Sequence, residues 1–448
     1  MKGLKLPKFK VIPSEDSKLN NLSLVRLQGE PYENGYNMGQ EFRDEVHRLY
    51  KTLFSRSPLS FVNGRPFLHA PIGRKVKTKE FEEAFEIIKE HIPDEYMDEM
   101  NGLAKGSGVP LEQVHMAHIL PTITEHYQAK MECFEDADKI FPTTCSVIGA
   151  VGNATEKGHV YTVRILDWLR ALNLHERPVV LCYEPQENDK NVSMGFSWPG
   201  FCGFVTGVND KGISFGEQGW RNTPDQESLD GMPFTFLARD MLTKTSTQDE
   251  AVDFFRDAYR TCSYVYLIAS GREQKAQILL TTASSGHEGF QVFDTGDTIS
   301  DGYYGGDMTF RGIPGCVYSG MFDEVIYQRL TDWYGDLNLE SLMRIAVDAA
   351  SNDAVQTVIT KLPRTKSESV DIWVSNAKYT GLFGNDGRRY KSGRTDYAYI
   401  NLDEILNGAK RIRNVGTFYY EGMPTEEKQE LMRAPDRYLN PKFDEKIN

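Results

Sequence analysis

The sequence is poor in the features that mark membrane, nucleic-acid-binding and disulfide-stabilised proteins. Its 448 residues contain no apolar run near the roughly 20 residues that a membrane-spanning helix needs. Basic residues are outnumbered, with 51 Lys and Arg against 64 Asp and Glu, and the net charge of −13 argues against nucleic-acid or anionic-membrane partners. Six cysteines are scattered without a CxxC pair. Neither a zinc site nor a disulfide framework is indicated, and we expect no metal or cofactor.

The amino terminus lacks a recognisable export signal. Residues 1–10 are rich in lysine and have no apolar core, so they do not resemble a signal peptide. Together with the scattered thiols, this favours a cytoplasmic protein with reduced cysteines. Three N-x-S/T triplets begin at Asn21, Asn153 and Asn191. They would matter in a secreted or lysosomal protein, which is the alternative if a signal has been removed.

The chain does contain enough apolar sequence for a large core. Aliphatic, aromatic and cysteine residues make up 40% of it, and no internal repeat or low-complexity linker divides it. Helical periodicity predominates in the first part, with helices predicted over 81–92, 95–105 and 111–119. Short β-type runs then alternate with pairs of helices. We expect an α+β fold with antiparallel sheets, in which residues 1–144 form a helical segment and residues 145–448 the core of one globular unit.

The run PTTCSVIGA, which contains Cys145, is the stretch around which the rest is organised. It places the cysteine at the first position of an apolar, β-prone run, and a second such run follows at 159–168. The second run contains Arg164 and Asp167 in otherwise apolar sequence. Because a turn over 153–158 would fold the two runs into a hairpin, a thiol, a guanidinium and a carboxylate would converge at one of its ends.

A cysteine thiol becomes a strong nucleophile only as the thiolate, so it needs a base or a cation nearby. Nine histidines are present, but none lies in a recognisable Cys/His signature, and a histidine base has no specific support. The other solution is cleavage of the Thr144–Cys145 bond, which would give Cys145 a free α-amino group with a pKa of about 8. That amine would serve as a general base on the residue that carries the nucleophile.

Each of these residues also has a purely structural interpretation. A cysteine at the start of an apolar strand is commonly a buried core thiol, and Arg164 with Asp167 could be only a buried ion pair. In the segment GVNDKGI, Asn209 and Asp210 followed by Gly212 are typical of a tight hairpin turn. Taken singly, the residues leave both interpretations open.

The order and spacing of several motifs resemble the acyl-CoA:6-aminopenicillanate acyltransferase family. The likeness extends from about residue 25 to about residue 400, and part of it is shared with choloylglycine hydrolases and acid-ceramidase-like amidases. The motifs are, in chain order, GEPYENG at 29–35 with Gly39, GLAKG at 102–106 with LEQV at 111–114, TCS at 144–146, RILDW at 164–168 and GVNDKGI at 207–213.

The resemblance implies an N-terminal-nucleophile hydrolase. Such proteins are four-layer αββα sandwiches that cleave themselves before the nucleophile and act on amide C–N bonds. By position, Cys145 would be the nucleophile and, through its amine, the base, while Arg164 and Asp167 would hold that amine and the substrate. The substrate-binding residues implied in the same way are Trp168, Asn209, Glu217, Gln218 and Asp307.

One segment departs from the family pattern. Relatives carry an asparagine as oxyanion donor in a later strand-end motif, where this chain has Tyr304-Gly305-Gly306-Asp307-Met308. An ionised Asp307 has no proton to donate to an oxyanion. Either the motif lies elsewhere, a backbone N–H takes its place, or the activity is altered.

We therefore expect a self-processing cysteine hydrolase or acyltransferase, an amidase that is a zymogen until autocatalytic cleavage and then acts through a thioester on Cys145. Its substrate would be a small N-acyl amide, with an acyl-CoA as the alternative acyl donor, and the two cleaved chains would stay associated. Two other functions remain open. One is a catalytically impaired binding or scaffold protein that keeps the fold, which the 304–308 segment favours, and the other is a phospholipase-B-like acyl-ester hydrolase.

Overall fold

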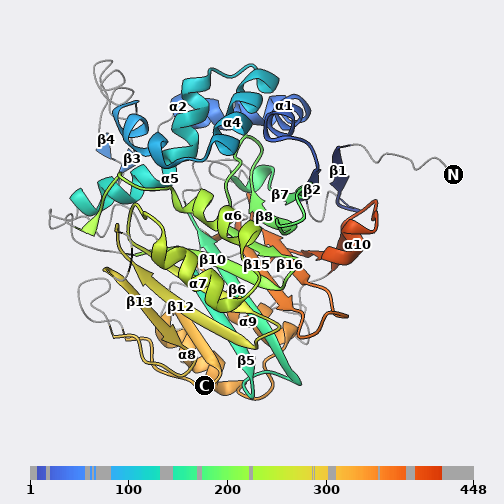
Figure 1. Cartoon of the computed structure of the whole chain (residues 1–448). Coiled ribbons are helices and arrows are strands. Elements are labelled where there is room, and N and C mark those ends of the chain that lie inside the picture. Colours follow the sequence, from blue (N-terminus) through green and yellow to red (C-terminus); the bar gives the residue numbers. More distant parts are fainter. Residues whose placement is uncertain are drawn as a thin grey trace.

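Two stacked β-sheets form the centre of the molecule (Figure 1). The structure is a computed structural model. It describes residues 8–16, 21–55, 61–62, 65–66, 82–131, 145–168, 174–220, 226–284, 286, 288–300, 309–351, 354–379 and 389–415.

The larger sheet has nine strands in the order β1-β2-β7-β8-β9-β10-β11-β12-β13. Its strands are β1 (Phe9–Pro13), β2 (Ser23–Leu27), β7 (Val179–Tyr183), β8 (Ser193–Ser197), β9 (Thr206–Asn209), β10 (Ile213–Gly219), β11 (Tyr264–Ser270), β12 (Lys275–Thr281) and β13 (Phe290–Asp294). All neighbours are antiparallel except β2 and β7, which pair in parallel. Parallel neighbours need a long crossover, and here the chain between them contains the N-terminal helices and two strands of the other sheet.

The smaller sheet has seven strands in the order β14-β5-β6-β15-β16-β19-β20, all antiparallel. These are β14 (Cys316–Gly320), β5 (Ser146–Gly152), β6 (Gly158–Asp167), β15 (Ala354–Leu362), β16 (Asp371–Asn376), β19 (Tyr397–Asn401) and β20 (Arg413–Val415). Two short pairs stand apart, β3 (Phe61–Val62) with β4 (Arg65–Pro66) and β17 (Lys378–Tyr379) with β18 (Arg389–Tyr390).

The two sheets face each other, and helices cover both outer sides. β5 contacts β10, β11 and β12 across the interface, and a methyl group on Gly149 of β5 would come within 2.7 Å of Ala276 Cβ on β12. Outside the larger sheet lie α6 (Phe234–Lys244) and α7 (Gln248–Asp257), and outside the smaller one lie α8 (Asp323–Asp332) and α9 (Leu339–Asp348). The four-layer αββα sandwich implied by the motifs is therefore present.

The N-terminal helices gather at one end of the sandwich (Figure 1). They are α1 (Pro31–Glu41), α2 (Arg43–Ser55), residues 82–88 with the short η2 (Lys89–His91), α4 (Asp94–Ser107) and α5 (Leu111–Met131). The helix predicted over 111–119 runs twelve residues further, through Pro121. Apolar and polar residues are spread around α5 without an amphipathic period from which its end could be predicted, and Pro121 lies inside it.

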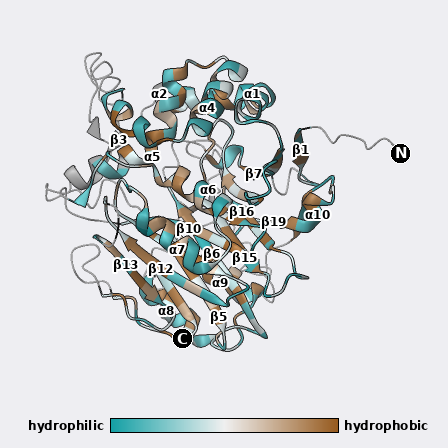
Figure 2. Cartoon of the chain, in the orientation of Figure 1, coloured by the Kyte–Doolittle hydropathy of each residue, from teal (hydrophilic) through white to brown (hydrophobic). Residues whose placement is uncertain are grey.

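Buried apolar side chains form two clusters, and the apolar colour of Figure 2 is concentrated in the strands. One cluster fills the space between the sheets and beneath α8 and α9. The other joins the larger sheet to the helices α1 to α7, and it includes Cys145 and Leu166 from the smaller sheet. Cys145 thus lies where the end of the sandwich meets the helical segment. Among the described residues, no helix is long and apolar enough to cross a membrane.

Glycines allow α1 and α4 to pack with their backbones in close contact. Methyl groups on Gly35 and Gly102 would overlap the carbonyl oxygens of Glu99 and Tyr32, respectively. The motif glycines near residues 29–39 and 102–106 therefore serve helix packing, and they hold the helical segment in shape above the sandwich.

We predict that Gly102→Ala lowers the free energy of unfolding by about 2 kcal/mol, because the added methyl forces the two helices apart. The expected sign is diagnostic, since alanine normally stabilises a helix by up to about 1 kcal/mol relative to glycine. Thermal and urea unfolding measure the effect. Lys105→Ala, an exposed change on the same helix, is the control and should stay within about 0.5 kcal/mol. A stabilised Gly102→Ala protein would contradict the packing.

Candidate active site

The β5–β6 hairpin places Cys145 beside Arg164 and Asp167. Cys145 immediately precedes β5, and in the hairpin register Arg164 is paired with Val147. Residues two apart on a strand share a face, so Cys145 and Arg164 both point towards the other sheet. Nη2 of Arg164 lies 3.6 Å from Cys145 Sγ, and the thiol lies 3.6 Å from the backbone oxygen of Asp167. The hairpin thus places the thiol beside the Arg164 guanidinium and the backbone oxygen of Asp167, whereas the carboxylate of Asp167 accepts a hydrogen bond from the Ser351 backbone.

Glu217 reaches the same point from the other sheet. Nη2 of Arg164 donates to Glu217 Oε2 at 3.0 Å, and Nε donates to the Glu217 backbone oxygen at 3.1 Å. The side chains of Arg164 and Glu217 are only 3% and 9% exposed. Gly216 leaves room for the arginine, because a methyl group there would lie 3.2 Å from Arg164 Cγ. Nη1 of Arg164 is also buried and has no hydrogen-bond partner in the part of the chain that the structure describes.

These surroundings keep the thiol protonated in the uncleaved chain. Burial raises the pKa of Cys145 to about 12; Arg164 acts against this rise, whereas Glu217 and Asp167 add to it. Burial likewise raises the pKa of Glu217 to about 7, with Arg164 again opposing the shift. At neutral pH the sulfur therefore needs a base before it can attack a carbonyl.

Asp167 is fixed at the end of β6 by the opposite strand. It is 1% exposed, pairs with Ala354 of β15 in the sheet register, and its Oδ2 accepts a hydrogen bond of 3.3 Å from the Ser351 backbone N–H. Neither Ser351 nor the buried Lys391 that lies behind it was identified from the sequence. Lys391 belongs to the short polar segment KSGRTD, where no periodicity separates a buried lysine from an exposed one.

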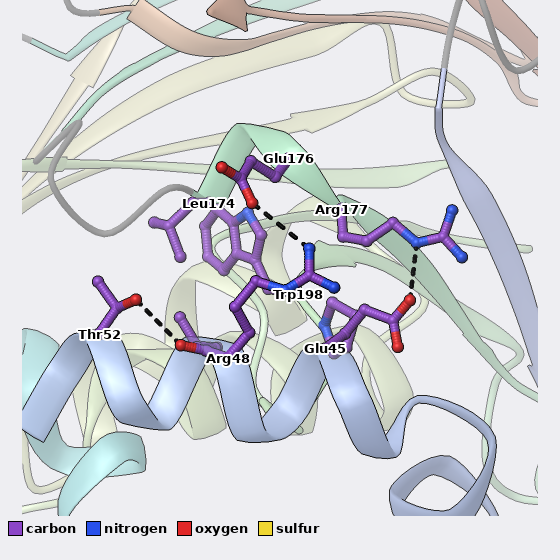
Figure 3. Close-up of a pocket in the computed structure, with 9 residues that line it drawn as sticks. Glu45, Arg48, Thr52, Leu174, Glu176, Arg177 and Trp198 are labelled. Carbon is purple, nitrogen blue, oxygen red and sulfur yellow. Dashed lines mark hydrogen bonds and ion pairs between the residues drawn. The ribbon is translucent and has the colours of Figure 1, made fainter. Parts of the chain in front are cut away.

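Trp168 extends the site into an aromatic wall. Its ring centroid lies 6.1 Å from that of Trp198, which in turn lies 6.4 Å from Phe201. Trp198 also lines a surface pocket between α2 and η5 (Leu174–Glu176) (Figure 3). Two ion pairs cross this pocket, Arg48–Glu176 at 3.5 Å and Arg177–Glu45 at 3.2 Å. Its lining contains neither Cys145 nor Asp167, so it adjoins the aromatic wall without including the thiol.

Three of the predicted substrate-binding residues, Asn209, Gln218 and Asp307, are not placed beside the thiol by the described structure. Asn209 joins its turn to the end of α6: it donates to the Leu242 and Thr245 carbonyls at 2.8 Å each and accepts from the backbone N–H groups of Lys211 and Ile213. Glu217 lies four residues beyond Ile213, about 13 Å along β10. Gln218 is buried and follows Glu217, so its side chain points to the opposite face of β10. Asp307 lies outside the described residues.

A histidine base is not provided by His118, the most deeply buried of the histidines near the helical segment. Its Nδ1 lies 2.8 Å from the Val114 carbonyl, and its Nε2 accepts a hydrogen bond from the Cys202 N–H. Burial lowers the pKa of His118 to about 4, so the ring is neutral. Its Nδ1 is bonded within α5, and its Nε2 joins that helix to the turn after β8.

The layered fold and the buried cysteine before an inner strand agree with the class implied by the motifs. Residues 182–288 match the model of the acyl-coenzyme A:6-aminopenicillanic acid acyl-transferase family. The matched segment contains the GVNDKGI motif and Glu217. The resemblance inferred from the ordered motifs is thereby confirmed for this part of the chain.

Related sequences come from distant organisms. The chain is 28% identical over 271 residues to protein dcd1B and 26% identical over 262 residues to protein dcd1A, both of Dictyostelium discoideum. These matches cover 58% and 54% of this chain and 50% and 55% of the relatives. An uncharacterized protein of Archaeoglobus fulgidus is 24% identical over 275 residues, 59% of this chain and 44% of that protein. The chain spans about half the length of the curated relatives it matches.

Solved structures with some similarity include two hydrolases. An N-acylethanolamine-hydrolyzing acid amidase ortholog of Caenorhabditis elegans has a TM-score of 0.38 and 14% identity, over 50% of this chain and 94% of that one. A variant of the conjugated bile acid hydrolase of Clostridium perfringens has a TM-score of 0.33 and 9% identity, over 60% of this chain and 96% of that one.

We predict that Arg164→Met and Glu217→Gln change the reactivity of Cys145 in opposite directions. Removing the guanidinium raises the pKa of the thiol, and removing the carboxylate lowers it, so alkylation by iodoacetamide slows in the first variant and accelerates in the second. Each unit of pKa shift corresponds to about tenfold in thiolate population. Peptide mass spectrometry measures the rates, and each comparison is made between samples in the same state, either all uncleaved or all cleaved before Cys145.

Cys316 is the matched internal control for this experiment. It is buried, and burial alone raises its pKa, to about 12, so its alkylation should be the same in both variants. If Cys145 changed in the same direction in the two variants, or Cys316 changed with it, general loosening of the fold would explain the result and the charge assignment would be wrong.

Proposed function

We propose that this chain is a self-processing cysteine amidohydrolase or acyltransferase with Cys145 as nucleophile. The observation that supports this most strongly is the convergence of a buried thiol, Arg164, Asp167 and Glu217 where the two sheets meet the helical segment. A cysteine that only fills the core needs no charged neighbours, because an unreactive thiol packs well among apolar side chains alone. Three buried charges around one sulfur are costly to fold, which argues that they serve the sulfur.

The raised pKa of the thiol supports a zymogen. In the first step of the proposed reaction, Sγ of Cys145 attacks the carbonyl carbon of Thr144, and the Thr144–Cys145 C–N bond breaks as the amine takes up a proton. Water then hydrolyses the resulting thioester, leaving a carboxylate on Thr144 and a free amine on Cys145. Residues 1–144 and 145–448 would stay associated, because the helical segment shares a buried apolar cluster with the larger sheet.

The released α-amine would then act as general base. Its ordinary pKa of about 8 allows it to accept the thiol proton, and the carboxylate of Asp167 would stabilise the ammonium so formed. The thiolate attacks the substrate carbonyl. The amine of the substrate then leaves with the proton that the α-ammonium group returns, and a thioester forms on Cys145. Water completes hydrolysis, whereas attack of a second amine on the thioester gives acyl transfer. An acyl-CoA would be the alternative donor, acylating Cys145 with the CoA thiol as the leaving group.

Arg164 is our candidate for the oxyanion donor. Its Nη1 is a buried N–H group without a partner among the described residues, and its Nη2 is already at the sulfur. Charged donors aimed at a developing oxyanion contribute several kcal/mol in a dry site, typically about 3 kcal/mol for each donor. This assignment does not depend on Asp307, whose carboxylate cannot serve. Trp168 and the apolar residues around Cys145 favour an apolar acyl group.

We predict that the purified protein consists of two chains, residues 1–144 and 145–448, and that Cys145→Ala remains a single chain. The thiol supplies the attacking atom, so no other residue can replace it. Intact mass spectrometry measures the outcome, and Cys316→Ala should be cut like the unchanged protein. A cut before residue 145 in Cys145→Ala would contradict the mechanism. If the protein without substitutions were not cut, the binding or scaffold function would be favoured.

A second measurement separates the amidase from an acyl-ester hydrolase. We predict that medium-chain N-acyl 4-nitroanilides release nitroaniline and leave a transient acyl adduct on the chain that begins with Cys145. The matched 4-nitrophenyl esters should also react, because esters are the easier acyl donors. Turnover of the esters and of lysophospholipids without any turnover of the anilides would indicate the phospholipase-B-like alternative. Binding without an adduct would indicate a protein that has lost catalysis.

A further inference from the structure

A buried lysine lies directly behind Asp167. Lys391 is 4% exposed, and its Nζ donates a hydrogen bond of 2.5 Å to the carbonyl oxygen of Ala350. The N–H of the same peptide group, which belongs to Ser351, donates to Asp167 Oδ2 at 3.3 Å. One peptide group thus has a buried ammonium on its oxygen and a buried carboxylate on its nitrogen.

This connection has a direct electrostatic consequence. A cation on a peptide oxygen polarises the group and strengthens the hydrogen bond that its N–H donates, and the effect is largest where water is excluded. The position also suits a cation, because Ala350 follows α9 and presents a carbonyl beyond the C-terminal end of that helix. Lys391 therefore favours the ionised form of Asp167 and fixes the direction from which that carboxylate is held.

The other charges near Lys391 come from two further elements. Asp348, at the end of α9, raises the pKa of Lys391, as does Asp167 of β6, whereas Arg394 lowers it. Asp348 is paired with Arg329, whose Nε lies 2.9 Å from its Oδ2. Burial is the largest influence and brings the pKa of Lys391 down to about 7. The lysine is thus close to losing its charge within the neutral range.

We propose that Lys391 is a positioning residue of the Cys145 site, which acts through the Ala350–Ser351 peptide to orient Asp167 and to set how strongly that carboxylate binds the α-ammonium group of Cys145. The inference rests on the proposed function, because the ammonium exists only after cleavage. Nζ of Lys391 binds the Ala350 carbonyl, so the proposed effect on the sulfur is indirect. The charge of Lys391 opposes that of the ammonium, so it keeps the amine from becoming too basic to return its proton.

The test uses the two-chain protein and iodoacetamide, so it requires no knowledge of the substrate. Loss of a positive charge behind Asp167 raises the pKa of both the thiol and the amine. In Lys391→Met, the pH at which the Cys145 alkylation rate rises should therefore move upward. We expect a shift of about one pH unit for the loss of one nearby buried charge. Lys391→Arg keeps the charge at every pH. Its alkylation rate should therefore rise at the same pH as in the unchanged protein, or at a lower pH.

Two controls separate positioning from stability. Lys361→Met removes a partly buried lysine at the far end of β15, where Lys361 pairs with Tyr161, and it should leave the profile unchanged. Thermal unfolding of all variants reports damage to the fold, which would lower the melting temperature without moving the profile. In Asp167→Asn, adding Lys391→Met should shift the profile further by much less, because the coupled partner is gone.

The outcomes distinguish this inference from the proposed function. An unchanged protein that is never cut before Cys145 overturns the proposed function, and with it the role of the ammonium. A protein that is cut normally, with identical alkylation profiles for Lys391→Met, Lys391→Arg and the unchanged chain, overturns the role of Lys391 alone. Opposite or unequal shifts of the methionine and arginine variants, in the directions given above, support it.

Discussion

The ion pair between Arg164 and Glu217 is the interaction on which the site depends. It joins the two sheets at one end of the sandwich, and it is almost entirely withdrawn from water. A buried pair of this kind contributes little to stability in itself, because the cost of removing both charges from water offsets their attraction. Its effect is to specify position. Glu217 holds the guanidinium through both its carboxylate and its backbone oxygen, and so fixes one guanidinium nitrogen beside the thiol.

The sequence carried most of the information for the hairpin and little for what surrounds it. Cys145, Arg164 and Asp167 could be placed at one end of the hairpin by inference because two adjacent strands with a short turn carry them. The alternation of side chains puts Cys145 and Arg164 on one face and Asp167, three residues beyond Arg164, on the other. Glu217 comes from the other sheet. Its approach depends on how the sheets stack and on the space beside Gly216, and the sequence contains no local signal for either, so only the family resemblance pointed to it.

The same distinction applies to Asn209 and to the residues that sequence reasoning missed. Asn209 belongs to a motif with a recognisable turn, and its side-chain oxygen accepts hydrogen bonds from the Lys211 and Ile213 N–H groups of that turn. Its amide nitrogen instead donates to the Leu242 and Thr245 carbonyls at the end of α6, a long-range contact that the turn pattern does not predict. Lys391 and Ser351 lie more than 180 residues from the hairpin in sequence and reach it only through the pairing of β15 with β6. Strand pairs of such long range are set by the whole fold, and no local pattern reports them.

Taken together, the buried charges alternate in sign across the site. Glu217 and Arg164 stand on one side of the sulfur, and Asp167 and Lys391 stand on the other. Burial has the largest effect on the pKa of the thiol and raises it; Arg164 opposes this rise, whereas Glu217 and Asp167 add to it. Cleavage before Cys145 would add a single ionisable amine to these groups. In the proposed mechanism, this one new proton acceptor beside Asp167 would convert the protonated thiol into a nucleophile, and the charges of Asp167 and Lys391 would then control the activated state.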